Sequence, residues 1–333
     1  MQPFEYTRAT AIQEVIQLLD QDGDDSVYPL AGGTDLLTLM KADIVAPRQL
    51  LDLKRVDQLP AGITETPDGI TLGALTTLAE IEQSPLIQER CPPLAQAAAV
   101  AATPQLRNMA TLGGNLLQRP RCWYYRSPLF HCWLKGGDEC HAYDGENQLH
   151  ALFGGGPCYA VHPSDLAPAL LALDAEVHFV GAQGERTVPL ADLFALPEDH
   201  RRRETVLAFD ELIHSVRIPA TALGNKGHFL KAMDRKVWAF ALVSVATVLH
   251  LDGGRISDAR IILGGVAPIP WRVPAAEQRL VGSQLDAERI VQAAEAALAG
   301  AEPLRHNAYK LPLAQSLVRR ALTLLADSAE SNA

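Results

Sequence analysis

The chain has 333 residues, of which 48% are hydrophobic and 20% are charged. This composition is typical of a soluble globular protein and excludes a disordered or fibrous one, and the length predicts two or three domains. The net charge of −10 repels phosphate backbones and anionic lipids, so we expect no nucleic acid or anionic membrane surface as a partner.

The N-terminus predicts a helix and no export signal. Thr10 and Gln13 form a capping box, and apolar residues then recur at helical spacing, which favours a helix at 11–20. The first twenty residues lack a basic start followed by an apolar run, so we expect no signal peptide belonging to the chain itself.

A strand, a turn with two glycines and a helix come next. Residues 27–30 predict a strand, Gly32 and Gly33 a tight turn, Thr34 the start of a helix, and residues 49–56 a second strand. Such a turn lets the backbone approach an anion such as a phosphate, which the helix N-terminus also favours. The alternative is a plain strand-to-helix turn.

A second glycine pair follows an antiparallel segment. Residues 62–74 alternate and turn at 67–69 like a β-hairpin, and residues 92–102 are rich in helix formers. Gly113–Gly114 then interrupts an apolar run and precedes Asn115, an adaptable hydrogen-bonding side chain. The two glycine turns could cradle a pyrophosphate from both sides, although neither of the usual nucleotide fingerprints, GxGxxG and GxxxxGK[ST], occurs.

Four of the five cysteines lie in one segment at about 119–160. They are separated by nine, seven and seventeen residues: Cys122, Cys132, Cys140 and Cys158. Four converging thiolates suit either zinc or an iron–sulfur cluster. Zinc sites usually use closely spaced cysteine pairs, which are absent here, so the spacing favours a cluster.

Two other interpretations of the four cysteines stay open at this point. They could bind zinc, or they could be unrelated buried thiols. Cys91 lies outside the segment and is expected to be a packing residue.

Beyond the cysteine segment, residues 165–180 predict a helix and then a strand, and residues 211–219 predict another strand. Asp165 stands at the start of that helix. It is interpreted either as an N-cap or as a carboxylate that accepts hydrogen bonds from ligand hydroxyls.

Residues 222–227 predict a linker to a C-terminal part. Within that part, the run 238–249 is the longest apolar stretch of the chain, but it is shorter than the roughly 20 residues of a membrane span and predicts a buried strand. Lys231 and Arg235 are expected to be surface charges unless a ligand uses them. The remaining expected elements are strands around 228–234, 239–251 and 255–266, and helices at 286–299 and 308–326.

Several stretches together resemble the FAD-binding medium subunits of the xanthine dehydrogenase family of molybdenum hydroxylases. They are AGGTDLL at 31–37, QLRNMATLGGNLLQRPRC at 105–122, HPSD at 162–165, FALVSVATV at 240–248 and LGGVAPIPWR at 263–272. The resemblance covers nearly the whole chain. The cysteine segment is similar to that of family members with an extra [4Fe-4S] cluster, above all the FAD subunits of periplasmic aldehyde oxidoreductases.

The resemblance implies an α+β fold with two domains. A PCMH-type FAD-binding domain would occupy 1–220, in lobes at about 1–55 and 56–220, with the [4Fe-4S] cysteine insertion at about 119–160. A C-terminal α+β domain like that of the carbon monoxide dehydrogenase flavoprotein would occupy 225–328.

The resemblance also implies site residues. Asp165 would contact the ribose of FAD, Ile213 would contact the flavin ring through its backbone, and Lys231 would lie near that ring. The two FAD-contacting loops would consist of Ala31, Gly32, Gly33, Thr34, Asp35 and Leu36, and of Thr111, Gly113, Gly114 and Asn115. The ligands of the [4Fe-4S] cluster would be Cys122, Cys132, Cys140 and Cys158.

The implied role is that of an electron outlet. A molybdenum cofactor-binding large subunit would oxidise an aldehyde, and a [2Fe-2S] small subunit would pass the electrons to FAD in this chain and on to an external acceptor. The three subunits would form a heterotrimer. Its location would be the periplasm, reached by co-export with a signal-bearing partner, or alternatively the cytoplasm.

Two other functions stay open. The chain also resembles the FAD subunit of 4-hydroxybenzoyl-CoA reductase, which carries a cluster-binding insertion and runs reductive chemistry. From a different class, it could be a zinc-stapled scaffold protein without flavin.

Overall fold

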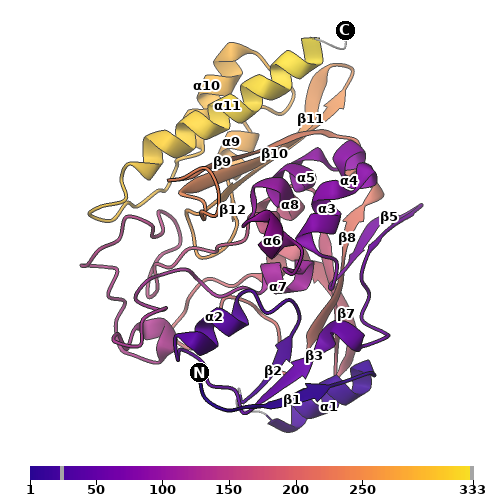
Figure 1. Cartoon of the computed structure of the whole chain (residues 1–333). Coiled ribbons are helices and arrows are strands. Elements are labelled where there is room, and N and C mark those ends of the chain that lie inside the picture. Colours follow the sequence, from indigo (N-terminus) through magenta and orange to yellow (C-terminus); the bar gives the residue numbers. More distant parts are fainter. Residues whose placement is uncertain (23–25, 331–333) are drawn as a thin grey trace.

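The computed structural model describes residues 1–22 and 26–330, and this part of the chain forms three β-sheets with helices packed against them (Figure 1). The first sheet is parallel, with strand order β1-β3-β2. Helix α1 covers it with Val15 and Leu19, which are buried in one cluster with Val27 and Leu51 of the sheet. The elements of this lobe are β1 (Glu5–Arg8), α1 (Ile12–Asp22), β2 (Val27–Leu30), α2 (Leu36–Lys41) and β3 (Gln49–Asp52).

The second sheet is antiparallel, with strand order β4-β5-β8-β6-β7. Ile70 and Leu72 of β5 pair with Ile218 and Val216 of β8, and all four are buried in the main core. Its strands are β4 (Ile63–Thr66), β5 (Gly69–Gly73), β6 (Glu176–Gly181), β7 (Gly184–Pro189) and β8 (Leu212–Pro219). The helices of this part are α3 (Leu78–Gln83), α4 (Pro85–Arg90), α5 (Pro92–Val100), α6 (Pro104–Arg107), α7 (Leu112–Leu116) and α8 (Leu166–Ala172).

The third sheet, with order β12-β11-β10-β9, is buried on both faces. Val243 and Val245 of β10 belong to a core with helices α9 to α11, whereas Ala246 and Val248 belong to the main core with α5 and α8. A strand covered on both faces needs apolar residues at successive positions, which explains the long apolar run. The elements are β9 (Lys226–Ala232), β10 (Val243–Asp252), β11 (Arg255–Gly264), β12 (Trp271–Arg272), α9 (Pro274–Glu277), α10 (Ala287–Ala296) and α11 (Lys310–Glu330).

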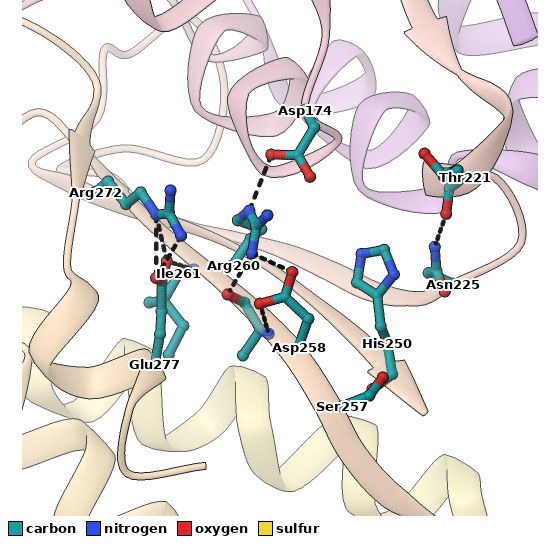
Figure 2. Close-up of polar contacts among 11 residues, drawn as sticks. Asp174, Thr221, Asn225, His250, Ser257, Asp258, Arg260, Ile261, Arg272 and Glu277 are labelled. Carbon is teal, nitrogen blue, oxygen red and sulfur yellow. Dashed lines mark hydrogen bonds and ion pairs between the residues drawn. The ribbon is translucent and has the colours of Figure 1, made fainter. Parts of the chain in front are cut away.

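Ion pairs on the third sheet fix it to the rest of the chain (Figure 2). Arg260 of β11 donates to Asp174, just after α8, at 2.9 Å, and to Asp258 at 2.6 Å. The buried carboxylate of Glu277 accepts from Arg272 at 2.9 Å and from the backbone of Ile261 at 2.9 Å. These contacts connect the third sheet to α9 and to the residues that follow α8.

The cysteine segment joins α7 to α8 as irregular chain. Its described residues contain no strand, and its single helical turn is a 3₁₀ turn at Trp133–Lys135. In Figure 1 it forms the magenta loops beside α2. These loops therefore lie next to the glycine turn that precedes α2.

Most sequence predictions of elements are confirmed, with shifted ends. The predicted helix at 34 begins at Leu36, because Asp35 is its N-cap residue. The predicted strand at 49–56 ends at Asp52, whose side chain accepts from the backbone of Lys54 and starts a 3₁₀ turn. The linker predicted at 222–227 is shorter, since β9 begins at Lys226.

One end of the long apolar run is not a strand. Trp238 is 60% exposed with φ of 58°, and the strand begins only at Val243. Strands β1 and β7 were not predicted. No helix in the described ranges has the length and apolar character to cross a membrane.

Candidate cofactor site

A cavity of about 760 Å³ lies between the parallel lobe and the second sheet, a size usual for ligand pockets. Both glycine turns line it, and so does the early part of the cysteine segment, including Tyr125 and His131. The stretch 202–213 closes another side. The cavity therefore gathers four segments that are far apart in the sequence.

The first glycine turn is shaped by close backbone packing. Gly33 has φ of 70°, a conformation that favours glycine. A Cβ on Gly32 would lie 1.7 Å from the carbonyl oxygen of Met109, so this glycine lets the two turns touch. All six residues from Ala31 to Leu36 line the cavity.

The second turn presents an open glycine to the cavity. The Thr111 hydroxyl caps α7 by accepting from the backbone of Gly114 at 3.3 Å. A Cβ on Gly114 would meet only that hydroxyl within 4 Å, at 3.1 Å, so a larger side chain would extend into the cavity. Asn115 does not line this cavity, and its side-chain oxygen accepts from Ser164 at 2.5 Å.

The carboxylate of Asp35 ties the first turn to the cysteine segment. It accepts from Arg121 at 2.8 Å, from Arg126 at 2.6 Å and from the backbone of Arg119 at 2.8 Å. Burial lowers the pKa of Arg121 to about 10, and Asp35 opposes that shift. The side chain of Asp35 thus holds the two segments together, and Asp35 is also one of the residues that line the cavity.

Asp165 and Lys231 form a buried ion pair. Their side chains are 7% and 1% exposed, and Lys231 Nζ lies 2.6 Å from Asp165 Oδ2. The expectation that Lys231 is a surface charge was wrong, because β9 points it inward to Asp165. Burial raises the pKa of Asp165, and Lys231 opposes the rise.

Asp165 is also not a side-chain cap. It stands at the N-cap position of α8 but makes no cap hydrogen bond. Ser164 accepts from the backbone of Ala167 at 3.0 Å instead. The carboxylate is therefore available to Lys231.

A smaller cavity of about 190 Å³ is lined by residues from both the predicted FAD site and the cysteine segment. Asp165 lines it from α8 and Cys122 from the cysteine segment. Arg235 and Phe240 line it from the loop before β10. Lys231 does not line it, although its partner Asp165 does.

His162 lines both cavities and was missed from the sequence, where it was only part of HPSD. Its Nε2 lies 3.3 Å from the carbonyl oxygen of Leu116, and its Nδ1 has no hydrogen-bond partner among the described residues. Burial lowers the pKa of His162 to about 4, so the ring is neutral at pH 7. Because a carbonyl oxygen can only accept, Nε2 carries the proton of the neutral ring, and Nδ1 keeps an unused lone pair.

Ile213 lines the large cavity as a consequence of a β-bulge. The pairing of β6 with β8 shifts between His178 and Phe179, so that His178 pairs with Ser215 and Phe179 with Ile213. His214 is the extra residue. Bulges re-aim neighbouring residues, and here both Leu212 and Ile213 reach the cavity.

The four cysteines of the segment pack in two adjoining clusters. Cys122 belongs to both, Cys132 and Cys140 to one, and Cys158 to the other with Trp133. The interaction between the thiols of Cys140 and Cys158 lowers the pKa of Cys140 to about 6 and raises that of Cys158.

All five cysteines are free thiols. Cys91 is buried in the main core, away from the segment. Burial raises the pKa of Cys91 to about 12. Within the described residues, no group of three or more His, Cys, Asp or Glu side chains has the spacing to hold a single metal ion.

Two family models match the chain. Residues 2–221 match the FAD binding domain in molybdopterin dehydrogenase, and residues 228–325 match the CO dehydrogenase flavoprotein C-terminal domain. The matches follow one another along nearly the whole chain.

Curated relatives match over most of their own length. The aldehyde oxidoreductase FAD-binding subunit PaoB of Escherichia coli (strain K12) is 37% identical over 86% of this chain and 87% of the relative. The carbon monoxide dehydrogenase medium chain of Hydrogenophaga pseudoflava is 33% identical over 96% of both chains.

Solved structures share the fold. A carbon monoxide dehydrogenase from H. pseudoflava that lacks the Mo-pyranopterin moiety of its molybdenum cofactor has a TM-score of 0.75 at 30% identity, covering 97% of this chain and 98% of that one. Quinoline 2-oxidoreductase from Pseudomonas putida 86 has a TM-score of 0.75 at 27% identity, covering 98% of each chain. The chain therefore belongs to the family of FAD-binding medium subunits of the molybdenum hydroxylases.

Proposed function

We propose that this chain is the electron outlet of a molybdenum-dependent aldehyde oxidoreductase. It takes electrons from the molybdenum and [2Fe-2S] centres of partner subunits and passes them through FAD to an external acceptor. The aldehyde substrate class is supported by the relative named aldehyde oxidoreductase FAD-binding subunit PaoB. The single observation that carries the electron-outlet role is the cavity in which two glycine turns meet the cysteine segment.

The residues of the large cavity fit FAD. Residues Ala31 to Leu36 of the first turn, with Thr111, Gly113 and Gly114 of the second, would hold its pyrophosphate and neighbouring groups, because close backbone approach is possible at both turns. Gly114 leaves open the volume that a side chain would fill. FAD, when bound, accepts two electrons and releases them singly or as a pair.

The assignments of the other FAD residues are part of the same proposal. Asp165 contacts the ribose, Ile213 lies beside the flavin ring, and Lys231 acts by holding the Asp165 carboxylate. The Asn115 side chain is fixed by the hydroxyl of Ser164, which donates to its amide oxygen, and Ser164 lines the smaller cavity. His162, which lines both cavities, is a further residue beside the proposed ligand.

The same proposal gives the cysteine segment a [4Fe-4S] cluster. Its ligands are Cys122, Cys132, Cys140 and Cys158, whose side chains already lie in two adjoining packed clusters. Four thiolates are the donor set of such clusters, and a cluster spreads its ligands more widely than a single ion does. The aromatic rings of Tyr124, Tyr125 and Trp133 shield the sulfurs from water.

The proposed assembly is a heterotrimer with a molybdenum cofactor-binding large subunit and a [2Fe-2S] small subunit. We place the FAD-binding domain at 1–220, with lobes at about 1–55 and 56–220, and the C-terminal domain at 225–328. The proposed location is the periplasm, reached with a partner that carries an export signal.

The test is to purify the chain together with the products of its neighbouring genes and to record the absorption spectrum and metal content. We expect flavin bands, iron beyond that of the small subunit, and dye reduction that depends on an aldehyde. A colourless protein that contains zinc would support the scaffold alternative. Turnover of an aromatic CoA thioester without aldehyde oxidation would support the 4-hydroxybenzoyl-CoA reductase alternative.

A further inference from the structure

His150 is a buried histidine that contacts one of the four cysteines. It is 2% exposed, and its Nε2 lies 3.2 Å from the sulfur of Cys122. Its ring also meets Trp123 edge-on, with 5.3 Å between the ring centroids. His150 belongs to no sequence motif, so the sequence alone does not predict a role for it.

The proton of this contact can be assigned from the chemistry of the sulfur. A thiolate that binds iron carries no proton and can only accept a hydrogen bond. Nε2 must then be the donor, whichever charge the ring carries. The other nitrogen, Nδ1, has no partner among the described residues, and His150 lines the smaller cavity.

The C-terminal domain holds His150 in place. Lys310, the first residue of α11, is fully buried and donates to the carbonyl oxygens of His150 at 3.0 Å and Gly265 at 2.8 Å. The amide of Asn307 donates to the His150 carbonyl at 3.1 Å and to that of Ala151 at 3.0 Å. Lys310 and Asn307 therefore fix the backbone of His150 beside Cys122 through these hydrogen bonds.

We propose that His150, held by Lys310, donates a hydrogen bond to Cys122 and thereby raises the reduction potential of the cluster. This inference rests on the proposed [4Fe-4S] cluster. One-electron reduction adds a negative charge to the cluster and its sulfurs, and a hydrogen-bond donor to a ligand sulfur stabilises that charge. His150 is a positioning residue for a ligand and does not itself bind iron.

The experiment uses the whole complex with three substitutions in this chain. His150→Phe keeps a ring against Trp123 and removes the donor, whereas His150→Gln keeps an amide donor. His141→Phe is the matched control, because His141 lies in the same segment but pairs with Glu139 at 3.4 Å. Each complex is titrated with dithionite while the cluster is followed by electron paramagnetic resonance, and iron is counted.

We expect a more negative midpoint potential in His150→Phe at unchanged iron content, a smaller shift in His150→Gln and none in His141→Phe. Lys310→Met should shift the potential in the same direction as His150→Phe, and its melting temperature reports whether the fold survives. An unchanged potential in His150→Phe with full iron would overturn the inference. Loss of iron from both His150 variants would also overturn it, by making His150 a structural contact only.

Failure of the proposed function gives a different result. The unsubstituted complex would then show no iron beyond that of its small subunit. The two failures are therefore separated by the first measurement of the series.

Discussion

Gly32 and Gly114 are both required to be small, but for different physical reasons. Gly32 lies against the Met109 carbonyl, so any side chain would push the two turns apart. Gly114 faces open volume, so a side chain there would leave the fold intact and fill the space of the ligand. A substitution of Gly114 therefore tests ligand binding alone, whereas a substitution of Gly32 would also disturb the fold.

Gly114→Val should therefore remove FAD without unfolding the chain. We expect a loss of at least tenfold in affinity, about 1.4 kcal/mol, because the branched side chain occupies the cavity beside Thr111. Gly114→Ala should lose less. The ratio of flavin to protein after purification measures the effect, and full flavin in Gly114→Val with an unchanged melting temperature would exclude this loop as a contact.

Asp165→Ala should destabilise the fold as well as the site. It would leave the Lys231 ammonium buried without its partner, which typically costs about 3–5 kcal/mol. Adding Lys231→Met should recover part of that loss, because no uncompensated charge remains. Denaturant unfolding of the two single variants and the double variant measures the coupling, and simple additivity of the two losses would contradict a direct ion pair.

His162 should make stability depend on pH. Burial lowers its pKa from 6.5 to about 4, so the unfolded chain binds a proton that the folded chain excludes between these values. Neutral His162 therefore contributes fully to the free energy of unfolding above pH 6.5. This contribution is lost as the pH falls towards 4, and the loss is about 2 kcal/mol at pH 5. His162→Gln should reduce the pH dependence of the unfolding free energy between pH 7 and 5 by that amount, and an unchanged dependence would rule out this role for His162.

At the scale of elements, the sequence predicted many of those whose burial leaves a pattern, although the short capped helices α3 and α4 were missed. The hairpin turn at 67–69 and the doubly buried strand β10 follow from turn residues and from an apolar run. Strands β1 and β7 were missed because both are edge strands with mostly exposed side chains. Their positions are fixed by partners far along the chain, such as β3 for β1, and local residues carry no sign of this.

In the site, too, features with a local sequence pattern were predicted, whereas contacts between distant segments were not. Glycine spacing predicted the two turns that line the large cavity, and cysteine clustering predicted side chains that pack together. The clamp of Asp35 by Arg121 and Arg126 was not predictable, because it depends on how irregular chain folds back onto α2. The arginines of QRPRCWYYR were the only local signal of it.

Cysteine substitutions test the segment as one unit. Replacing Cys140 with Ser should lose the iron of this subunit and loosen the segment, because ligand binding and loop folding are coupled. Cys91→Ser is the matched control, since Cys91 is buried in the main core instead. Iron content and proteolysis of the segment measure both effects, and a full complement of iron in Cys140→Ser would contradict the assignment.

At the scale of the whole molecule, the C-terminal domain and the cysteine segment hold each other. The backbone of His306 donates to the side chain of Asn147 at 2.9 Å, and the hydroxyl of Tyr309 donates to the carbonyl of Gln148 at 3.0 Å. Together with the contacts of Lys310, these bonds attach residues 306–310 to the segment. Truncation before His306 removes all of these contacts and should therefore loosen the cysteine segment as well as the third sheet.

The proposed location can be tested on the assembled complex. If the complex is exported already folded with a signal-bearing partner, as proposed, cell fractionation of the native host should place the three subunits together in the periplasm. Deleting the signal of that partner should retain all three subunits in the cytoplasm. A complex found only in the cytoplasm of the native host would contradict the export proposal.

The chain alone should not oxidise an aldehyde. It contains five cysteines, of which four are assigned to one cluster and Cys91 is buried in the main core, so none remain for the thiolate ligands of a [2Fe-2S] cluster. The isolated chain should still accept electrons at its flavin from an artificial reductant such as dithionite. Aldehyde-dependent dye reduction should appear only when the two partner subunits are co-expressed, and substrate-dependent turnover by the isolated chain would refute the electron-outlet role.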